Sequence, residues 1–146
     1  MTLLPNGGTV MNKMKITFDA VSENESFARL AVSGFVLYLN PNLNEIEDIK
    51  TAVSEAVTNS IIHGYDEGGI IELSCNIEER NIKIVIEDFG KGIEDIEKAR
   101  VPTYTSKPEC ERAGIGFSVM ESCMDKIEVK SHMGEGTRIT MYKDLV

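Results

Sequence analysis

The stretch 51–64, Thr-Ala-Val-Ser-Glu-Ala-Val-Thr-Asn-Ser-Ile-Ile-His-Gly, is the feature that most constrains how this chain can fold. Intervals of three and four predict a helix with one buried stripe, made of Ala52, Val53, Ala56, Val57, Ser60 and Ile61. Glu55 and Asn59 lie four residues apart and therefore share another face. A carboxylate followed one turn later by a carboxamide can supply a proton acceptor and an oxygen ligand for Mg²⁺. Alone, however, the pattern is more typical of a solvated helix face.

Two further motifs follow in order. Residues 87–92, Glu-Asp-Phe-Gly-Lys-Gly, contain Asp-x-Gly-x-Gly, and Gly114-Ile-Gly116 opens another apolar helical run. Free backbone N–H groups at a glycine-rich helix start favour anionic oxygen, for which phosphate is the expected source. Each motif alone is typical of a tight turn or a helix boundary. Together with Glu55 and Asn59, the three motifs resemble the ATP-binding signature of the GHKL superfamily, which includes gyrase, Hsp90, histidine kinases and MutL.

Three longer sequence segments make the resemblance more specific. Residues 24–29 (Asn-Glu-Ser-Phe-Ala-Arg), 53–65 and 105–117 are similar to the bacterial anti-sigma-factor serine kinases, over roughly 14–142. The resemblance implies a cytoplasmic homodimer that holds a sporulation sigma factor inactive and uses Mg²⁺ and ATP to phosphorylate a serine of an anti-anti-sigma protein, leaving ADP. The nearest alternative is the related kinase that controls the general-stress sigma factor. Another is an interaction module in which nucleotide serves only as a structural clamp.

The resemblance also implies residue roles. Glu55 is expected to accept the substrate serine proton and Asn59 to ligate Mg²⁺. Asp88 is expected to accept a hydrogen bond from the adenine amino group, beside Gly90 and Gly92. The remaining expected nucleotide contacts come from Gly114 and Gly116, from the lid residues Thr105, Ser106, Lys107 and Arg112, and from Thr137 through an ordered water. Arg29 is expected to face protein partners. A strand position for Thr137, a solvated helix face for Arg29 and a loop position for Lys107 explain these three residues equally well.

The order of the predicted elements gives the fold. Residues 1–13 are expected to be a disordered lead that need not be native, with synthesis starting at Met11 or Met14. Residues 14–146 are expected to form one domain with a lid at 101–113. Alternating strands and amphipathic helices predict an α+β fold. Their order predicts a two-layer sandwich in which a mixed, mainly antiparallel sheet carries its helices on one face. The resemblance implies the same architecture, that of the GHKL (Bergerat) type.

Local signals place the ends of the first two helices. Ser22 with Glu25 predicts a capping box at the start of the first helix, which is expected to end before Pro41. Asn42 or Asn44 is expected to cap the second helix, which delivers Glu55 and Asn59.

Composition excludes several other classes of protein. A net charge of −9 argues against general affinity for nucleic acid. Three cysteines without a Cys-x-x-Cys pair predict reduced thiols and no structural metal. No apolar run reaches the roughly twenty residues that span a bilayer, so no membrane association is expected. A detached histidine kinase catalytic domain would need a phosphoacceptor helix pair, for which there is no room. A Rossmann fold would need a strand before Gly114.

Overall fold

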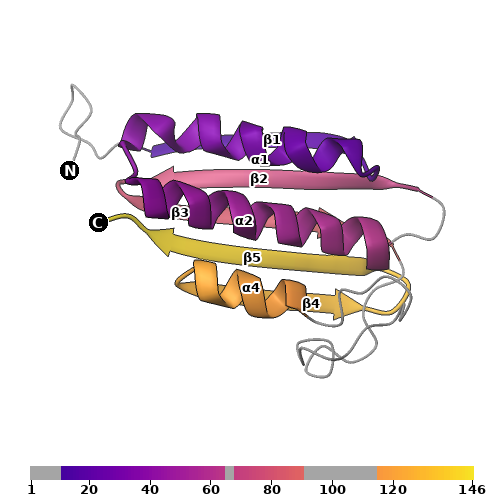
Figure 1. Cartoon of the computed structure of the whole chain (residues 1–146). Coiled ribbons are helices and arrows are strands. Elements are labelled where there is room, and N and C mark those ends of the chain that lie inside the picture. The colour runs from indigo at the N-terminus through magenta and orange to yellow at the C-terminus, as the bar shows by residue number, and fades with distance from the viewer. Residues whose placement is uncertain (1–10, 65–67, 91–114) are drawn as a thin grey trace.

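The computed structural model describes residues 11–64, 68–90 and 115–146, and it has two layers (Figure 1). One layer is a five-stranded sheet in the order β1-β2-β3-β5-β4, in which every described pairing is antiparallel. Its strands are β1 (Met11–Asp19), β2 (Ile70–Glu78), β3 (Asn81–Asp88), β4 (Lys126–His132) and β5 (Gly136–Asp144). The other layer holds α1 (Glu23–Val36), α2 (Leu43–Asn59) and α4 (Ile115–Cys123), all on one face of the sheet. This arrangement confirms the predicted α+β sandwich with helices on one face, but the described sheet is antiparallel and not mixed.

The core lies between the two layers. Every second residue of β2 and β3 points toward the helices and is buried, whereas the residues between them face the open side of the sheet. The buried side of α2 meets them with the predicted stripe of Ala52, Val53, Ala56 and Val57, all fully buried. Burial of apolar surface on this scale is the main favourable term in folding. This packing of α2 on the strands holds the helix over the middle of the sheet, between α1 and α4 (Figure 1).

The first strand starts earlier than the sequence predicts. Met11, Asn12 and Lys13 belong to β1 and pair with Glu78, Ile77 and Asn76 of β2, so the expected disordered lead does not extend to residue 13. The long strand β2 supplies backbone partners for these residues. Their own side chains are exposed, so no alternation marks them as a strand. Residues 1–10 lie outside the described part of the chain.

The predicted capping box at the start of α1 is also wrong. Ser22 has helical dihedral angles (φ −60°, ψ −28°) and makes no side-chain cap hydrogen bond, whereas an N-cap residue normally has extended ones. Glu25 instead pairs with Arg29, whose Nη1 lies 3.1 Å from Glu25 Oε1. Asn24 holds the entry to the helix by donating to the carbonyl of Asp19 at 2.9 Å. The helix then passes through a 3₁₀ turn, η1 (Leu37–Leu39), before Pro41.

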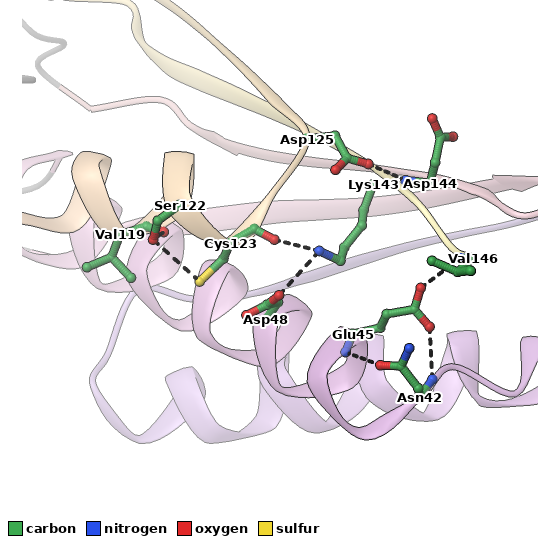
Figure 2. Close-up of polar contacts among 10 residues, drawn as sticks. All are labelled: Asn42, Glu45, Asp48, Val119, Ser122, Cys123, Asp125, Lys143, Asp144 and Val146. Carbon is green, nitrogen blue, oxygen red and sulfur yellow. Dashed lines mark hydrogen bonds and ion pairs between the residues drawn. The ribbon is translucent and has the colours of Figure 1, made fainter.

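Asn42 caps α2, which confirms one of the two predicted caps. Its side chain accepts from the backbone N–H of Glu45 at 2.8 Å, and Glu45 Oε1 accepts from the backbone N–H of Asn42 at 2.9 Å. The second oxygen of Glu45 accepts from the backbone N–H of Val146 at 2.8 Å (Figure 2). These backbone hydrogen bonds, of which the one from Asn42 is the stronger cause, hold the pKa of Glu45 below its usual value. One carboxylate therefore joins the start of α2 to the C-terminal end of β5.

A buried lysine makes a second tie between the layers. Lys143 of β5 donates to the carbonyl of Cys123 at 2.7 Å and lies 3.4 Å from Asp48 Oδ2 (Figure 2). It therefore links the last strand to the end of α4 and to the first turns of α2. A buried ammonium is stable only when it is paired and hydrogen-bonded in this way. Together the Glu45 and Lys143 contacts fix the end of the sheet opposite the end of β3.

Replacing Glu45 by alanine should therefore destabilise the fold by about 1–2 kcal/mol, because the capping box and the tie to Val146 are lost together. Urea denaturation at neutral pH measures this change. The matched control is Glu47→Ala, which removes an exposed ion pair with Lys50 and should change stability by less than about 0.5 kcal/mol.

The pH dependence follows from the lowered pKa of Glu45. The ionised form is favoured in the folded state, so its contribution is present above the unfolded pKa and disappears as the pH falls through the folded pKa. The difference between wild type and Glu45→Ala should therefore shrink in acid. Equal losses for Glu45→Ala and Glu47→Ala would contradict the role given to the cap.

Candidate functional site

A buried carboxylate stands at the end of β3. Asp88 is the last residue of that strand and is only 2% exposed. Its Oδ1 accepts from the backbone N–H of Gly90 at 3.1 Å and from the backbone N–H of Thr137 at 3.3 Å, and the hydroxyl of Ser60 also donates to the carboxylate. Burial raises the pKa of Asp88, while these hydrogen bonds act in the opposite direction. The fold therefore holds an acceptor in a fixed orientation at this end of the sheet.

Ser60 reaches Asp88 from the end of α2. The helix runs directly into a π-helical turn, η2 (Ser60–Gly64), whose first residue is 1% exposed. Such wide turns occur frequently at functional sites, since they change the direction in which following side chains point. The sequence assigned Ser60 to the buried stripe of the helix and missed its contact with Asp88. No spacing rule would have revealed a contact between a helix end and a strand end.

Glu55 and Asn59 lie on α2 just before this turn. Both are half-buried, whereas Ala52, Ala56 and Val57 beside them are fully buried. The two polar side chains therefore lie at the border of the buried stripe, one helical turn apart, as the sequence predicted. Asn59 directly precedes Ser60, which brings its carboxamide to the same end of the sheet as Asp88. A carboxylate and a carboxamide at this rim can accept a proton and ligate a hard cation.

The start of β5 forms the other side of the site. Thr137 is 4% exposed and pairs with Asp88 across the β3–β5 ladder. Its hydroxyl lies 2.9 Å from that of Ser131 on β4, and the Ser131 hydroxyl also donates to the carbonyl of Gly136 at 3.1 Å. Thr137 is thus both a strand residue and a neighbour of the buried carboxylate. The sequence did not assign any site role to Ser131.

Gly136 allows this close approach. Its φ of +110° is one that residues with a side chain rarely adopt, and a Cβ built there would lie 2.1 Å from the carbonyl oxygen of Asp88. No side chain fits at that distance. Nothing in the sequence marks this contact between Gly136 and Asp88, so it is a finding of the structure.

The remaining expected nucleotide contacts fall into two groups. Gly116 is the second residue of α4 and is buried, and α4 begins at the same end of the sheet as the end of α2 and the start of β5 (Figure 1). The other expected contacts and the lid at 101–113 lie outside the described residues: Gly92, Thr105, Ser106, Lys107, Arg112 and Gly114.

Arg29, expected to face protein partners, lies between the first two helices. Its Nη1 donates to Glu25 at 3.1 Å and to the hydroxyl of Ser54 on α2 at 3.3 Å. These contacts tie α1 to α2 one residue before Glu55. The side chain is still 35% exposed, so contact with a partner stays a prediction.

The side-chain oxygens of Asn59 and Asp88 are suited to binding a nucleotide together with Mg²⁺. Mg²⁺ commonly takes only one or two protein ligands and completes its shell with phosphate oxygens and waters, and Asn59 offers one such oxygen. Asp88 offers a buried acceptor for an amino group. Across residues 11–64, 68–90 and 115–146, no three or more His, Cys, Asp or Glu side chains come together as a metal cluster. None of the helices in these ranges is long and apolar enough to cross a bilayer.

Comparison with known proteins agrees with this geometry. The model of the histidine kinase-like ATPase domain family matches residues 25–143. The anti-sigma F factor of Clostridium novyi is 56% identical over 136 residues, covering 92% of this chain and 95% of the relative. The anti-sigma F factor of Clostridium acetobutylicum is 56% identical over 133 residues, covering 90% of this chain and 93% of the relative.

Solved structures share the fold at low sequence identity. The RsbU and RsbW domains of a Mycobacterium tuberculosis protein match with a TM-score of 0.68 at 20% identity, over 92% of this chain and 32% of that one. The catalytic domain of the histidine kinase ThkA matches with a TM-score of 0.57 at 16% identity, over 90% and 96%. From the family match and the high identity to its relatives, the chain belongs to the histidine kinase-like ATPase family and, within it, to the anti-sigma F factors.

Proposed function

We propose that this protein binds and inhibits the sporulation sigma factor F and, as an ATP-dependent serine kinase, phosphorylates its anti-anti-sigma factor. The observation that carries the proposal is the meeting of two features at one end of the sheet: the buried acceptor Asp88 and the Glu55–Asn59 pair on α2. High identity to relatives named anti-sigma F factors, over nearly their whole length, supports the sigma partner.

Asp88 gives nucleotide specificity in this proposal. Its carboxylate accepts a hydrogen bond from the adenine amino group, and Gly90 and Thr137 keep it oriented through their N–H groups. A buried acceptor disfavours a base that has a carbonyl oxygen where adenine has its amino group. The carboxylate and that carbonyl would both be acceptors, with no hydrogen to share between them. Gly116, at the start of α4, offers its backbone to the phosphates.

Glu55 and Asn59 serve the transfer step. The substrate serine oxygen forms a bond to the γ-phosphorus of ATP, the bond between that phosphorus and the bridging oxygen breaks, and ADP leaves. Glu55 takes the serine proton, and Asn59 holds Mg²⁺, which neutralises phosphate charge when bound. Most of the rate gain in such transfers comes from alignment and charge neutralisation, so Glu55 needs correct placement more than a shifted pKa.

The regulatory output is an exchange of partners. The protein acts as a cytoplasmic homodimer, with Arg29 facing its partners, and has no direct role in nucleic-acid binding. The ATP state favours the sigma factor, and the ADP state left after transfer favours the unmodified anti-anti-sigma protein. Two alternatives are kept: the equivalent kinase of the general-stress sigma factor, and a nucleotide-clamped interaction module without kinase activity.

The direct test is transfer of labelled γ-phosphate from Mg-ATP to the purified anti-anti-sigma protein of the same organism. Label on a serine of that protein is the expected result. If ATP binds and no label is transferred, the kinase proposal fails and the nucleotide-clamped module replaces it. The other alternative, the kinase of the general-stress sigma factor, is tested by competition between sigma F and that sigma factor for the ATP-bound protein. Preferential binding of sigma F is the expected result.

We expect Asp88→Asn to weaken ATP binding by about 10- to 100-fold, because a hydrogen bond to a buried charged acceptor is worth about 1.5–3 kcal/mol. Glu87→Gln is the matched control, since Glu87 precedes Asp88 on β3 and points to the open face of the sheet. Isothermal titration with ATP measures both variants. Equal affinities for the two would remove Asp88 from the nucleotide site.

The pKa of Asp88 is raised above its usual value, so this carboxylate takes up a proton at a higher pH than an ordinary aspartate does. ATP affinity depends on the ionised carboxylate and should fall as the pH drops through this raised pKa. The fall should therefore begin at a higher pH than an ordinary aspartate would give. Asp88→Asn should lack this step.

A further inference from the structure

Three polar side chains stand side by side at one end of the helix-facing side of the sheet. Asp88 of β3 pairs with Thr137 of β5, and Thr137 pairs with Ser131 of β4, so the three form one row across neighbouring strands. Residues directly opposite each other in a ladder share a face of the sheet. The next paired residues inward, Ile86 and Ile139, are apolar and fully buried. The polar row therefore belongs to the candidate nucleotide site and not to the core.

The two hydroxyl groups of this row can share their hydrogens in only one way that satisfies both of the contacts made by Ser131. Its Oγ lies 3.1 Å from the carbonyl oxygen of Gly136 and 2.9 Å from Thr137 Oγ1. A hydroxyl carries one hydrogen, and a carbonyl oxygen can only accept. Ser131 therefore donates to Gly136, because otherwise two acceptors would face each other. The hydroxyl hydrogen of Thr137 then goes to Ser131.

This order of hydrogens makes Thr137 an acceptor on the side of Asp88. Its backbone N–H is engaged with Asp88 Oδ1 at 3.3 Å, and its hydroxyl hydrogen is directed to β4, so only the lone pairs of the hydroxyl oxygen remain for a ligand. The hydroxyl of Ser60 donates to the Asp88 carboxylate, so its hydrogen is engaged as well. None of the hydroxyl hydrogens of Ser60, Ser131 and Thr137 is therefore left for an incoming base.

We propose that Ser131 helps to determine base specificity by taking the hydroxyl hydrogen of Thr137. The inference rests on the adenine site of the proposed function and adds a positioning residue to it. An amino group brings hydrogens to acceptors, directly or through a bound water, whereas a carbonyl oxygen at the same position needs a donor. While Ser131 holds its hydrogen, Thr137 cannot become that donor. Ser131 thus acts on the base through Thr137.

Thr137 without Ser131 would discriminate poorly between bases. A hydroxyl rotates about its C–O bond and can present either its hydrogen or a lone pair to a ligand, so it accepts an amino group and a carbonyl oxygen equally well. Asp88 differs, because an ionised carboxylate only accepts. Ser131 removes the freedom of Thr137 and gives it the same preference as Asp88. A base with a carbonyl oxygen then meets two buried acceptors instead of one, and unsatisfied buried polar groups are costly.

The test is Ser131→Ala in the full chain, followed by equilibrium titration with Mg-ATP and with Mg-inosine triphosphate (ITP). ITP has a carbonyl oxygen where ATP has its amino group and keeps the same ribose and phosphates. ATP affinity should change by less than about threefold, because Thr137 can still accept. ITP affinity should rise about five- to tenfold, because the released hydrogen of Thr137 can be donated to the carbonyl. General loosening of β4 would instead weaken the binding of both nucleotides.

Three further variants isolate the effect. Ser131→Thr keeps a hydroxyl on the same strand position and should keep the wild-type ratio of ATP to ITP affinity. Ser131→Ala combined with Thr137→Val lacks the released hydrogen, so it should show no gain in ITP affinity over Thr137→Val alone. Ser74→Ala is the matched control: it removes a serine hydroxyl from β2 on the open face of the sheet and should bind both nucleotides as wild type does.

A gain in ITP affinity that requires the Thr137 hydroxyl and is absent from Ser131→Thr supports the role of Ser131. An unchanged affinity ratio in Ser131→Ala, or the same gain in the presence of Thr137→Val, overturns it. A wild type that binds ITP as tightly as ATP also overturns it. Because these titrations measure binding alone, a protein that discriminates as expected but transfers no phosphate would refute the proposed kinase and leave the role of Ser131 standing.

Discussion

Glu55→Ala should transfer phosphate to the anti-anti-sigma protein about 10²- to 10⁴-fold more slowly than wild type, which is the usual contribution of a positioned general base. ATP binding should persist, because Glu55 sits on α2 one turn before Asn59, whereas the adenine acceptor Asp88 stands at the end of β3. The loss should therefore fall on the transfer rate and leave nucleotide affinity close to that of wild type. Single-turnover transfer of labelled phosphate measures the first quantity, and equilibrium ATP titration measures the second.

Two variants sharpen this experiment. Glu55→Gln keeps the shape of the side chain without its basicity, so it should lose transfer as Glu55→Ala does. Glu47→Ala removes a glutamate two turns earlier on the same helix, exposed and paired only with Lys50 among its described contacts, and should transfer normally. Wild-type transfer by Glu55→Ala would mean that the base lies elsewhere. Loss of ATP binding by the same variant would place Glu55 in the nucleotide pocket.

The elements that carry Glu55 and Asp88 could be predicted from the sequence because burial imposes a period on it. The stripe of Ala52, Val53, Ala56 and Val57 and the alternation in β2 and β3 both reflect one face packed against the core. The cap at Asn42 was readable for a similar reason, since its partner Glu45 is three residues away. Local patterns of this kind need no knowledge of the rest of the fold.

Contacts between distant segments leave no such pattern. Residues 11–13 form a strand because β2 extends past them, although their exposed side chains do not alternate. Ser22 and Glu25 have the spacing of a capping box, but Glu25 pairs with Arg29. Ser60 contacts Asp88 only because the end of α2 is packed on the sheet. In each case a partner far away in the sequence or a competing local partner decides the outcome.

Gly136 is the sharpest example, and Gly136→Ala should give the largest effect on both folding and nucleotide binding. Alanine at a φ of +110° is strained, and its Cβ would lie 2.1 Å from the backbone carbonyl oxygen of Asp88. Neither group is a flexible side chain, so β5 must move away from β3. Backbone strain and overpacking each cost about 1–3 kcal/mol, so a total loss of about 2–6 kcal/mol is expected in urea denaturation.

The same movement should weaken ATP binding, because Thr137 follows Gly136 and its N–H orients the carboxylate of Asp88. Gly134→Ala is the matched control: its φ is +80°, but a Cβ there meets nothing within 4 Å. It should cost only the backbone strain, about 1–2 kcal/mol, and should bind ATP as wild type does. If the two alanine variants were equally stable and bound ATP equally well, the approach of β5 to Asp88 would not be what orients the carboxylate. If Gly136→Ala lost both stability and ATP binding and Gly134→Ala kept them, the backbone contact between Gly136 and Asp88 would account for two features. These are the stability of the β3–β5 pair and the orientation of the Asp88 carboxylate.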